Sequence, residues 1–297
     1  MGITIDGDLE ESKASSVMEL VIMECLPLLR EAAHSNLVEI SSIITKPIQL
    51  NLQGKDKVLR HLKDLIDSEE LTQLGEHKIE SSRLFFDLRN VDLSCAYFYG
   101  VNFSYANLNG ANLRGVRFCN CSLDHVNLGE ANLVGAWLCG ANLKDANLRG
   151  AKLNSADLAV TDMRNADLRY ARLINSTLVR ADLRKANLLG ADLSYSDPSQ
   201  ARFIDAVLMH ARFVKAGLWN ANLSYADIRF ADFSGATLRE ANLIGTKMGE
   251  ELKVERAEFG NNPGLTEEDQ RQLQRRGAYC RDLPESSGIV AYISYDS

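Results

Sequence analysis

The 297-residue sequence lacks the features that mark membrane and secreted proteins. Its longest apolar stretch, residues 17–29, is interrupted by Glu19, Glu24 and Pro27 and is too short to span a bilayer. The first residues, Met-Gly-Ile-Thr-Ile-Asp, are acidic and precede no apolar core, unlike a secretory signal. We therefore expect a cytoplasmic protein that has no membrane partner.

Sequence motifs for catalysis and cofactor binding are also missing. The five histidines do not stand at metal-ligand spacing with Cys, Asp or Glu, and the sequence contains neither a phosphate-binding glycine loop nor a Gly-x-Ser-x-Gly motif. With 45% hydrophobic residues, 25% charged residues and only five prolines, the composition excludes collagen, disorder and a small disulfide scaffold. We predict that the protein is not an enzyme and has no cofactor and no metal.

A strict period of five residues runs through the middle of the chain. Steps of five from Leu88 to Met248 give 33 central positions, which hold 23 Leu, 6 Phe, 2 Met, one Ile and one Pro, Pro198. The 32 positions that stand two residues before a centre, from Val91 to Thr246, hold 23 Ala, and the others are Val, Cys, Thr or Ser. Neither an amphipathic helix nor an ordinary strand produces this pattern.

This period determines how the backbone must run. At 100° per residue, a helix would spread residues spaced by five around its whole circumference, so a helix is excluded. Two inward residues separated by one polar residue are the alternation of extended backbone, and the other two residues must turn the chain. Each pentapeptide is therefore predicted to form a short edge and a corner, wound around a core so narrow that only Ala-sized groups fit beside each large residue.

The repeated phrase identifies a family resemblance. Ala-Asn-Leu recurs at residues 131–133, 141–143 and 221–223, and the array of Ala-(Asn/Asp)-Leu-x-x units over residues 86–250 resembles the pentapeptide-repeat family. The resemblance implies a right-handed quadrilateral β-helix with four pentapeptides per coil, and thus about eight coils. At about 4.8 Å per coil, this solenoid would be roughly 40 Å long.

Both open ends of such a solenoid need a cover. Residues 1–85 predict an N-terminal α-helical domain that covers one end. Residues 251–297 predict a C-terminal capping helix and a tail; Thr266 is the expected N-cap, with Asp269 three residues later, and Gly277 is the expected stop. The strand-prone residues 289–293 of the tail have no predicted place. The expected fold class is thus mainly β, with helices at both ends.

Three of the six cysteines suggest a metal or disulfide site. In the five-residue register, Cys121 points inward and Cys119 points outward, so these two side chains diverge and do not form a chelate. Cys119 and Cys139 are one coil apart on one face. The coil spacing lies within the Cα range of a disulfide, although parallel side chains would strain the bond. We expect reduced thiols, and the sequence leaves open whether Cys119 and Cys139 can pair.

The charge of the array bears on nucleic-acid mimicry and binding. Residues 86–250 contain 18 basic and 16 acidic residues, a net charge of 18 − 16 = +2, whereas a mimic of duplex DNA should be strongly negative. The acidity lies in the flanks, with 9 basic against 15 acidic residues in 1–85 and 6 against 9 in 251–297. Nucleic-acid binding is also disfavoured, because acidic residues interrupt the one basic stripe: Lys144, Arg164, Arg184 and Lys185 stand among Asp145, Asp162 and Asp182.

One outward column of the predicted coil is apolar. This column and its flanking residues form the candidate face, which consists of Tyr97, Tyr99, Cys119, Trp137, Cys139, Val179 and Trp219. We expect the candidate face to bind another protein. A smaller cluster on another face is the secondary face: Tyr170, Leu189, Met209 and Phe230. A partner or a second subunit could cover the candidate face, the chain's own helices or tail could cover it, or it could stay exposed.

These observations predict a non-catalytic protein–protein interaction module. The family resemblance implies more, because such proteins abound in photosynthetic bacteria and some regulate cell differentiation or stress responses through protein contacts. A regulatory adaptor is therefore the expected function. The alternatives are a DNA-mimicking protein that binds topoisomerases and an accessory subunit of an enzyme. The sequence does not identify the partner, the pathway or the oligomeric state, and a homo-oligomer is compatible with it.

Overall fold

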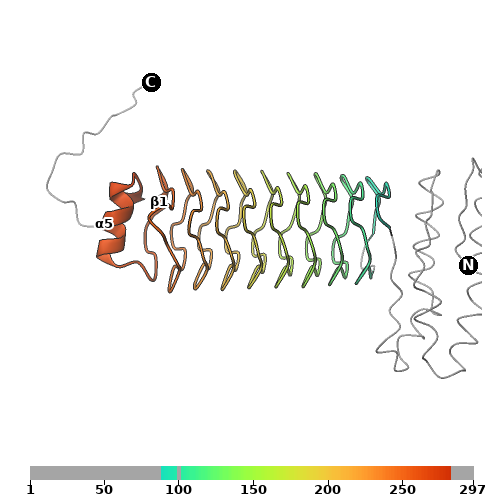
Figure 1. The fold of residues 1–297 in the computed structure, drawn as a ribbon, viewed down its shortest axis with the longest axis horizontal. Coiled ribbons are helices and arrows are strands. Elements are labelled where there is room, and N and C mark those ends of the chain that lie inside the picture. Colours follow the sequence, from blue (N-terminus) through green and yellow to red (C-terminus); the bar gives the residue numbers. More distant parts are fainter. Residues whose placement is uncertain (1–87, 99–101, 282–297) are drawn as a thin grey trace, which may run out of the picture.

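The structure, a computed structural model, describes residues 88–98 and 102–281, which form a straight stack of coils with a helix at its C-terminal end (Figure 1). The expected helical domain of residues 1–85, the tail residues 289–293 and Tyr99 lie outside the described residues. The named elements are β1 (Glu258–Phe259), α5 (Glu267–Arg275) and β2 (Tyr279–Cys280).

Parallel bridges between residues twenty apart join each coil to the next. Asn112 pairs with Asn132, and Asn132 pairs with Lys152. The central residues complete this ladder with their amides, as when Leu148 donates to the carbonyl of Asp167 at 2.7 Å. Because four turns separate each residue from its partner one coil later, the repeat is a four-sided β-helix whose sides are single bridges rather than long strands.

The four corners of each coil share one backbone conformation. The residue three after a centre donates its amide back to that centre, as from Ala151 to Leu148 at 3.0 Å. The residue two after the centre has a positive φ at every described position from Asn90 to Gly245, and the residue before it does not, which is the sign pattern of a type II turn. Most of these positions are not glycine, so the coil ladder holds many side chains in the left-handed region.

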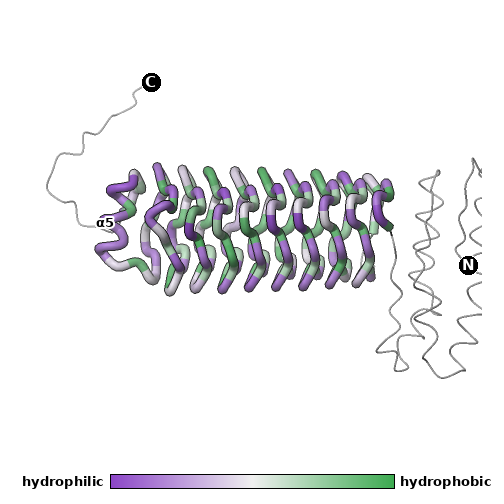
Figure 2. The backbone as a smooth tube through the Cα atoms, viewed as in Figure 1, coloured by the Kyte–Doolittle hydropathy of each residue, from purple (hydrophilic) through white to green (hydrophobic). Residues whose placement is uncertain are grey.

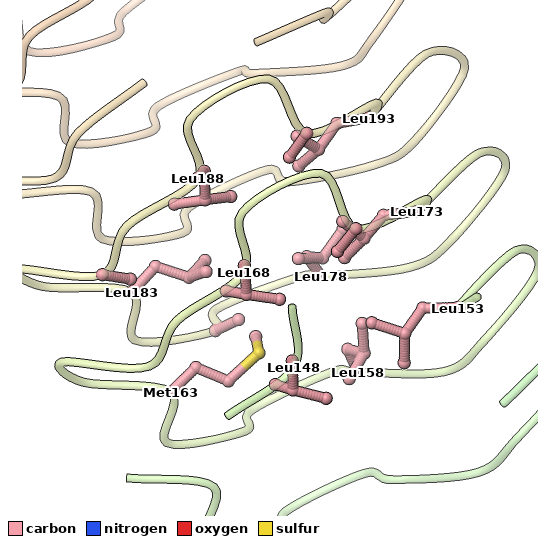
Figure 3. Packing of buried hydrophobic residues seen from close by; sticks show 14 of the residues in the cluster. Leu148, Leu153, Leu158, Met163, Leu168, Leu173, Leu178, Leu183, Leu188 and Leu193 are labelled. Carbon is pink, nitrogen blue, oxygen red and sulfur yellow. The ribbon is translucent and has the colours of Figure 1, made fainter. Parts of the chain in front are cut away.

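The predicted inward residues form one continuous core. Leu148, Leu168 and Leu188 stack directly above one another (Figure 3), and each is completely buried. The small position of the same pentapeptide, Ala146, is also buried, as predicted. Along the backbone tube, short apolar and polar segments alternate at every coil (Figure 2). Each pentapeptide therefore contributes both core and surface residues, so the division between core and surface repeats every five residues.

Pro198 occupies a buried central position despite having no amide to donate. Leu178 and Leu218, at the same position of the neighbouring coils, each donate an amide hydrogen bond to the next coil at 2.8 Å. The equivalent acceptor for Pro198, which has no amide proton, is the carbonyl of Gly217. There the Ser199 hydroxyl lies 3.1 Å from the Gly217 oxygen and also within hydrogen-bond distance of the Asp197 carboxylate. A side chain thus replaces the missing backbone donor.

The coil ladder continues past residue 250, where the sequence analysis ended the array. Asp232 pairs with Lys253 and Thr237 with Glu258, so the spacing changes from twenty to twenty-one residues. The last rung is the parallel pair of β1 and β2. The five-residue register did not reveal this extension, because one extra residue shifts every later centre.

Helix α5 begins where the sequence predicts. Thr266 is its N-cap: the hydroxyl accepts the Asp269 amide at 3.1 Å, and the Asp269 carboxylate accepts the Thr266 amide at 2.9 Å. Leu273 is buried and joins the core cluster of the coils. Gly277, with φ +87°, follows the end of the helix.

Candidate functional site

The described residues of the candidate face lie on one side of the coil, in two parallel columns. Tyr97 and Trp137 stand directly before a centre and are 60% and 50% exposed. Trp219 stands directly after a centre and is 42% exposed. The remaining members of the second column are partly buried: Cys119, Cys139 and Val179. The coil thus presents its two tryptophans on one face, as the register predicts.

Trp137 contacts the preceding coil through both its backbone and its side chain. It pairs through its backbone with Arg117 on the preceding coil, and the Arg117 guanidinium lies 5.1 Å from the centre of the indole ring. A cation at this distance is attracted to the ring face, so it restrains the indole while half of the residue stays exposed. Arg117 is part of this surface, although sequence reasoning did not single it out.

The candidate face is not one unbroken apolar stripe. The coil that carries Trp219 lies four coils beyond the coil of Trp137, a separation of about 19 Å along the axis at the usual strand spacing. Ala159 and Val179 fill the column between them, but Ser199 interrupts it with a hydroxyl that is bonded to Asp197 and Gly217. The surface therefore consists of two aromatic anchors joined by a short apolar segment.

Val160 extends this segment, and the sequence analysis missed it. It is 62% exposed and has φ +59°, a conformation that a β-branched residue rarely adopts. It occupies the corner next to Ala159, at the turn position that holds glycine in eight other described pentapeptides. The five-residue register could have identified Val160, because it places this valine at an outward corner. A strained and exposed valine contributes little to the stability or the solubility of the coil.

The cysteines behave as the register predicts. Cys121 is buried, and its Sγ lies 3.6 Å from the carbonyl oxygen of Phe98, whereas Cys119 points outward with its Sγ 3.8 Å from the carbonyl oxygen of Trp137. Cys119 and Cys139 are free thiols on consecutive coils. Burial, followed by hydrogen bonding to the Cys119 thiol, raises the pKa of Cys139 to about 11.

The secondary face carries charged and polar groups among its apolar ones. Tyr170 is 54% exposed, with the Arg149 guanidinium 6.0 Å from its ring centre. Phe230 stacks on His210 with ring centres 4.7 Å apart. Leu189 and Met209 are only partly exposed. The four residues do share one edge of the coil, but this edge is less apolar than the sequence suggested.

Two arginines of the basic stripe are paired with acidic neighbours, as the interleaved sequence predicts. The Arg164 guanidinium contacts the Asp162 carboxylate at 2.5 Å, and Arg184 contacts Asp182 at 2.7 Å. The hydrogen bond from Arg164 holds the pKa of Asp162 below its ordinary value, which favours the charged pair. Paired charges of this kind give a surface with little net attraction for a polyanion.

Over residues 88–98 and 102–281, no group of three or more His, Cys, Asp and Glu side chains comes together as a metal site. In the same part of the chain, no helix has the length and apolar character needed to cross a membrane.

The four-sided coil built from Ala-(Asn/Asp)-Leu-x-x units defines a class of repeat protein. The sequence profile described as Pentapeptide repeats matches the chain in eight copies, over residues 87–120, 121–158, 161–197, 186–224, 201–239 and 218–250. The chain belongs to the pentapeptide-repeat family, whose members are generally non-catalytic. This confirms the family resemblance and the repeat β-helix.

Several solved structures are similar to this chain. HetL, from the cyanobacterium Nostoc sp. strain PCC 7120 and involved in the regulation of heterocyst differentiation, is 27% identical, with 63% of this chain and 95% of HetL covered and a TM-score of 0.45. Rfr23 from the cyanobacterium Cyanothece 51142 is 34% identical over 31% of this chain and 62% of its own, with a TM-score of 0.30. Full-length QnrB1, a plasmid-mediated fluoroquinolone resistance protein, is 19% identical over 63% of this chain and 92% of its own, with a TM-score of 0.32. A search of curated proteins found no significant match.

Proposed function

We propose that this protein is a non-catalytic binding module that recognises another protein through the candidate face. The observation that carries the proposal is the pair of half-exposed tryptophans on one side of the coil, Trp137 and Trp219. Tryptophan in a patch that becomes desolvated is among the commonest anchors of protein interfaces. The exposed Val160, whose backbone is strained, lies between them and supports the same role.

A rigid scaffold suits this function. Every described coil from residue 102 onward is tied to its neighbours by backbone hydrogen bonds, so the outward columns keep fixed spacings. A partner then binds without ordering the surface first, which lowers the entropic cost of association. The finer role of a regulatory adaptor in a photosynthetic bacterium rests on the family resemblance.

The alternative of a DNA mimic that binds topoisomerases is less well supported. A mimic needs a continuous negative surface, whereas the array carries slightly more basic than acidic residues. The Asp162 and Asp182 carboxylates are in addition paired with arginines. A supercoiling assay with a purified topoisomerase tests this alternative directly: protection of the enzyme would favour the mimic over the adaptor.

Affinity capture with matched variants tests the proposal. Immobilised wild-type protein, Trp137→Glu and Trp219→Glu are each exposed to a native lysate, and the retained proteins are quantified by mass spectrometry. Tyr195→Glu is the control, because Tyr195 is 54% exposed at a corner outside the candidate face. We expect both tryptophan variants to lose the same partner by at least about tenfold, or 1.4 kcal/mol, and the control to keep it. Equal retention by all four proteins contradicts the proposal.

A further inference from the structure

Cys119 and Cys139 occupy the same position on consecutive coils. The bridge between Arg117 and Trp137 sets the register, and the Asn120 amide donates to the carbonyl of Cys139 at 3.0 Å. Both thiols are partly exposed. The Cys119 Sγ lies 3.8 Å from the carbonyl oxygen of Trp137, so it is directed toward the coil that carries Cys139. The Cys119 thiol also contributes to the raised pKa of Cys139. The coil thus places two accessible thiols side by side.

Their spacing suits one kind of ligand. Adjacent strands lie about 4.8 Å apart, and parallel side chains keep roughly this distance. A thiolate–metal bond is about 2.3 Å long, so an ion held between two opposed thiolates needs sulfur atoms about 4.6 Å apart. A disulfide needs sulfur atoms only about 2 Å apart and would pull the stacked side chains toward each other. The unstrained coil therefore fits a bridging ion better than a direct bond.

We propose that Cys119 and Cys139 form a two-thiolate site for one soft monovalent metal ion of the copper(I) class. Soft thiolate ligands select such ions over hard cations. A zinc ion would need four ligands, and in the described part of the chain no third His, Cys, Asp or Glu side chain joins the two thiols in a metal-binding group. On binding, two metal–sulfur bonds form, both thiol protons pass to solvent and no electron is transferred. The inference does not depend on the proposed function.

Competition for copper(I) tests the site. The full chain is titrated anaerobically with Cu⁺ in the presence of a coloured Cu⁺ chelator such as bathocuproine disulfonate. We expect the wild type to withdraw one more Cu⁺ per chain than Cys119→Ser or Cys139→Ser, each of which should bind at least about tenfold more weakly. Cys95→Ser and Cys25→Ser are the controls: Cys95 is an exposed thiol at another corner, and Cys25 lies outside the described residues.

Equal copper binding by the wild type, Cys119→Ser and Cys139→Ser would overturn the proposal, and so would an equal loss in Cys95→Ser. Serine preserves the size of these partly exposed side chains, and circular dichroism checks that each variant is folded. Fluorescence then locates the ion. With Trp219→Phe, the remaining tryptophan of the chain is Trp137, on the same coil side as Cys139. We expect Cu⁺ to quench it, and quenching that persists in Cys139→Ser places the ion elsewhere and refutes the site.

Discussion

Truncating one core leucine should strongly destabilise the whole coil, and Leu148→Ala is the clearest case. Leu148 is completely buried and stacks against Leu168 of the next coil (Figure 3). Leu128 occupies the same position of the preceding coil and is also buried. The substitution removes three carbon atoms and leaves a cavity. Whether the neighbours can fill it decides where the cost falls in the usual range for this change.

The backbone leaves little room for collapse. Leu128 and Leu148 both donate amides to the following coil at 2.7 Å, so the coil cannot contract without lengthening hydrogen bonds. The small position beside Leu148 holds Ala146, which cannot swing into the space. We therefore expect a loss of about 3 to 5 kcal/mol in the free energy of unfolding.

Chemical denaturation followed by circular dichroism measures this loss. Repeat arrays can unfold in parts, so hydrogen exchange of the amides near residue 148 accompanies the titration. Lys152→Ala is the control, because Lys152 is an exposed residue on the neighbouring side of the same coil and should change stability by less than about 0.5 kcal/mol. A loss below about 1 kcal/mol for Leu148→Ala would show that the core is not packed as described.

Three further predictions concern the hydrogen bonds and corners of the coil. Ser199→Ala should cost about 0.5 to 1.5 kcal/mol in denaturation, because the Gly217 carbonyl loses its substitute donor; no change would show that this bond is unimportant. Gly190→Ala should cost about 1 to 2 kcal/mol, since Gly190 has φ +66° and a new Cβ would lie 2.9 Å from the Tyr170 ring. Part of that cost should disappear in a Tyr170→Ala background, and full persistence there would exclude the ring clash. Hydrogen bonds from arginine lower the folded-state pKa of several aspartates below 3.8, so their contribution to stability is present above that pH and is lost as the pH falls through the lowered values. These aspartates are Asp162, Asp167 and Asp227. When Asn replaces them, the drop in melting temperature between pH 6 and about pH 3 should shrink, and an unchanged drop would exclude them as its cause.

The sequence predicted the parts of the fold that depend on position alone. The five-residue register assigns every centre, such as Leu148, to the core, and it places Trp137 and Trp219 on one outer face. It also separates the directions of Cys119 and Cys121. These properties follow from the alternation of extended backbone, which needs no knowledge of distant residues.

Features that depend on neighbouring coils could not be predicted in this way. The substitution of Ser199 for the missing amide of Pro198 requires knowing that the Gly217 carbonyl lies opposite. The ring contact between Arg117 and Trp137 depends on side-chain rotamers across two coils. Such details need the actual geometry, because several side-chain arrangements satisfy the same register.

Inward residues hold the coil together, whereas the candidate face is proposed to recognise a partner. The melting temperature of Trp219→Glu, measured beside its binding to the captured partner, tests this division most directly. We predict a melting temperature within about 2 °C of the wild type and binding weakened at least about tenfold. A melting temperature that falls as far as in Leu148→Ala, with binding unchanged, would show instead that Trp219 serves stability and would contradict the account.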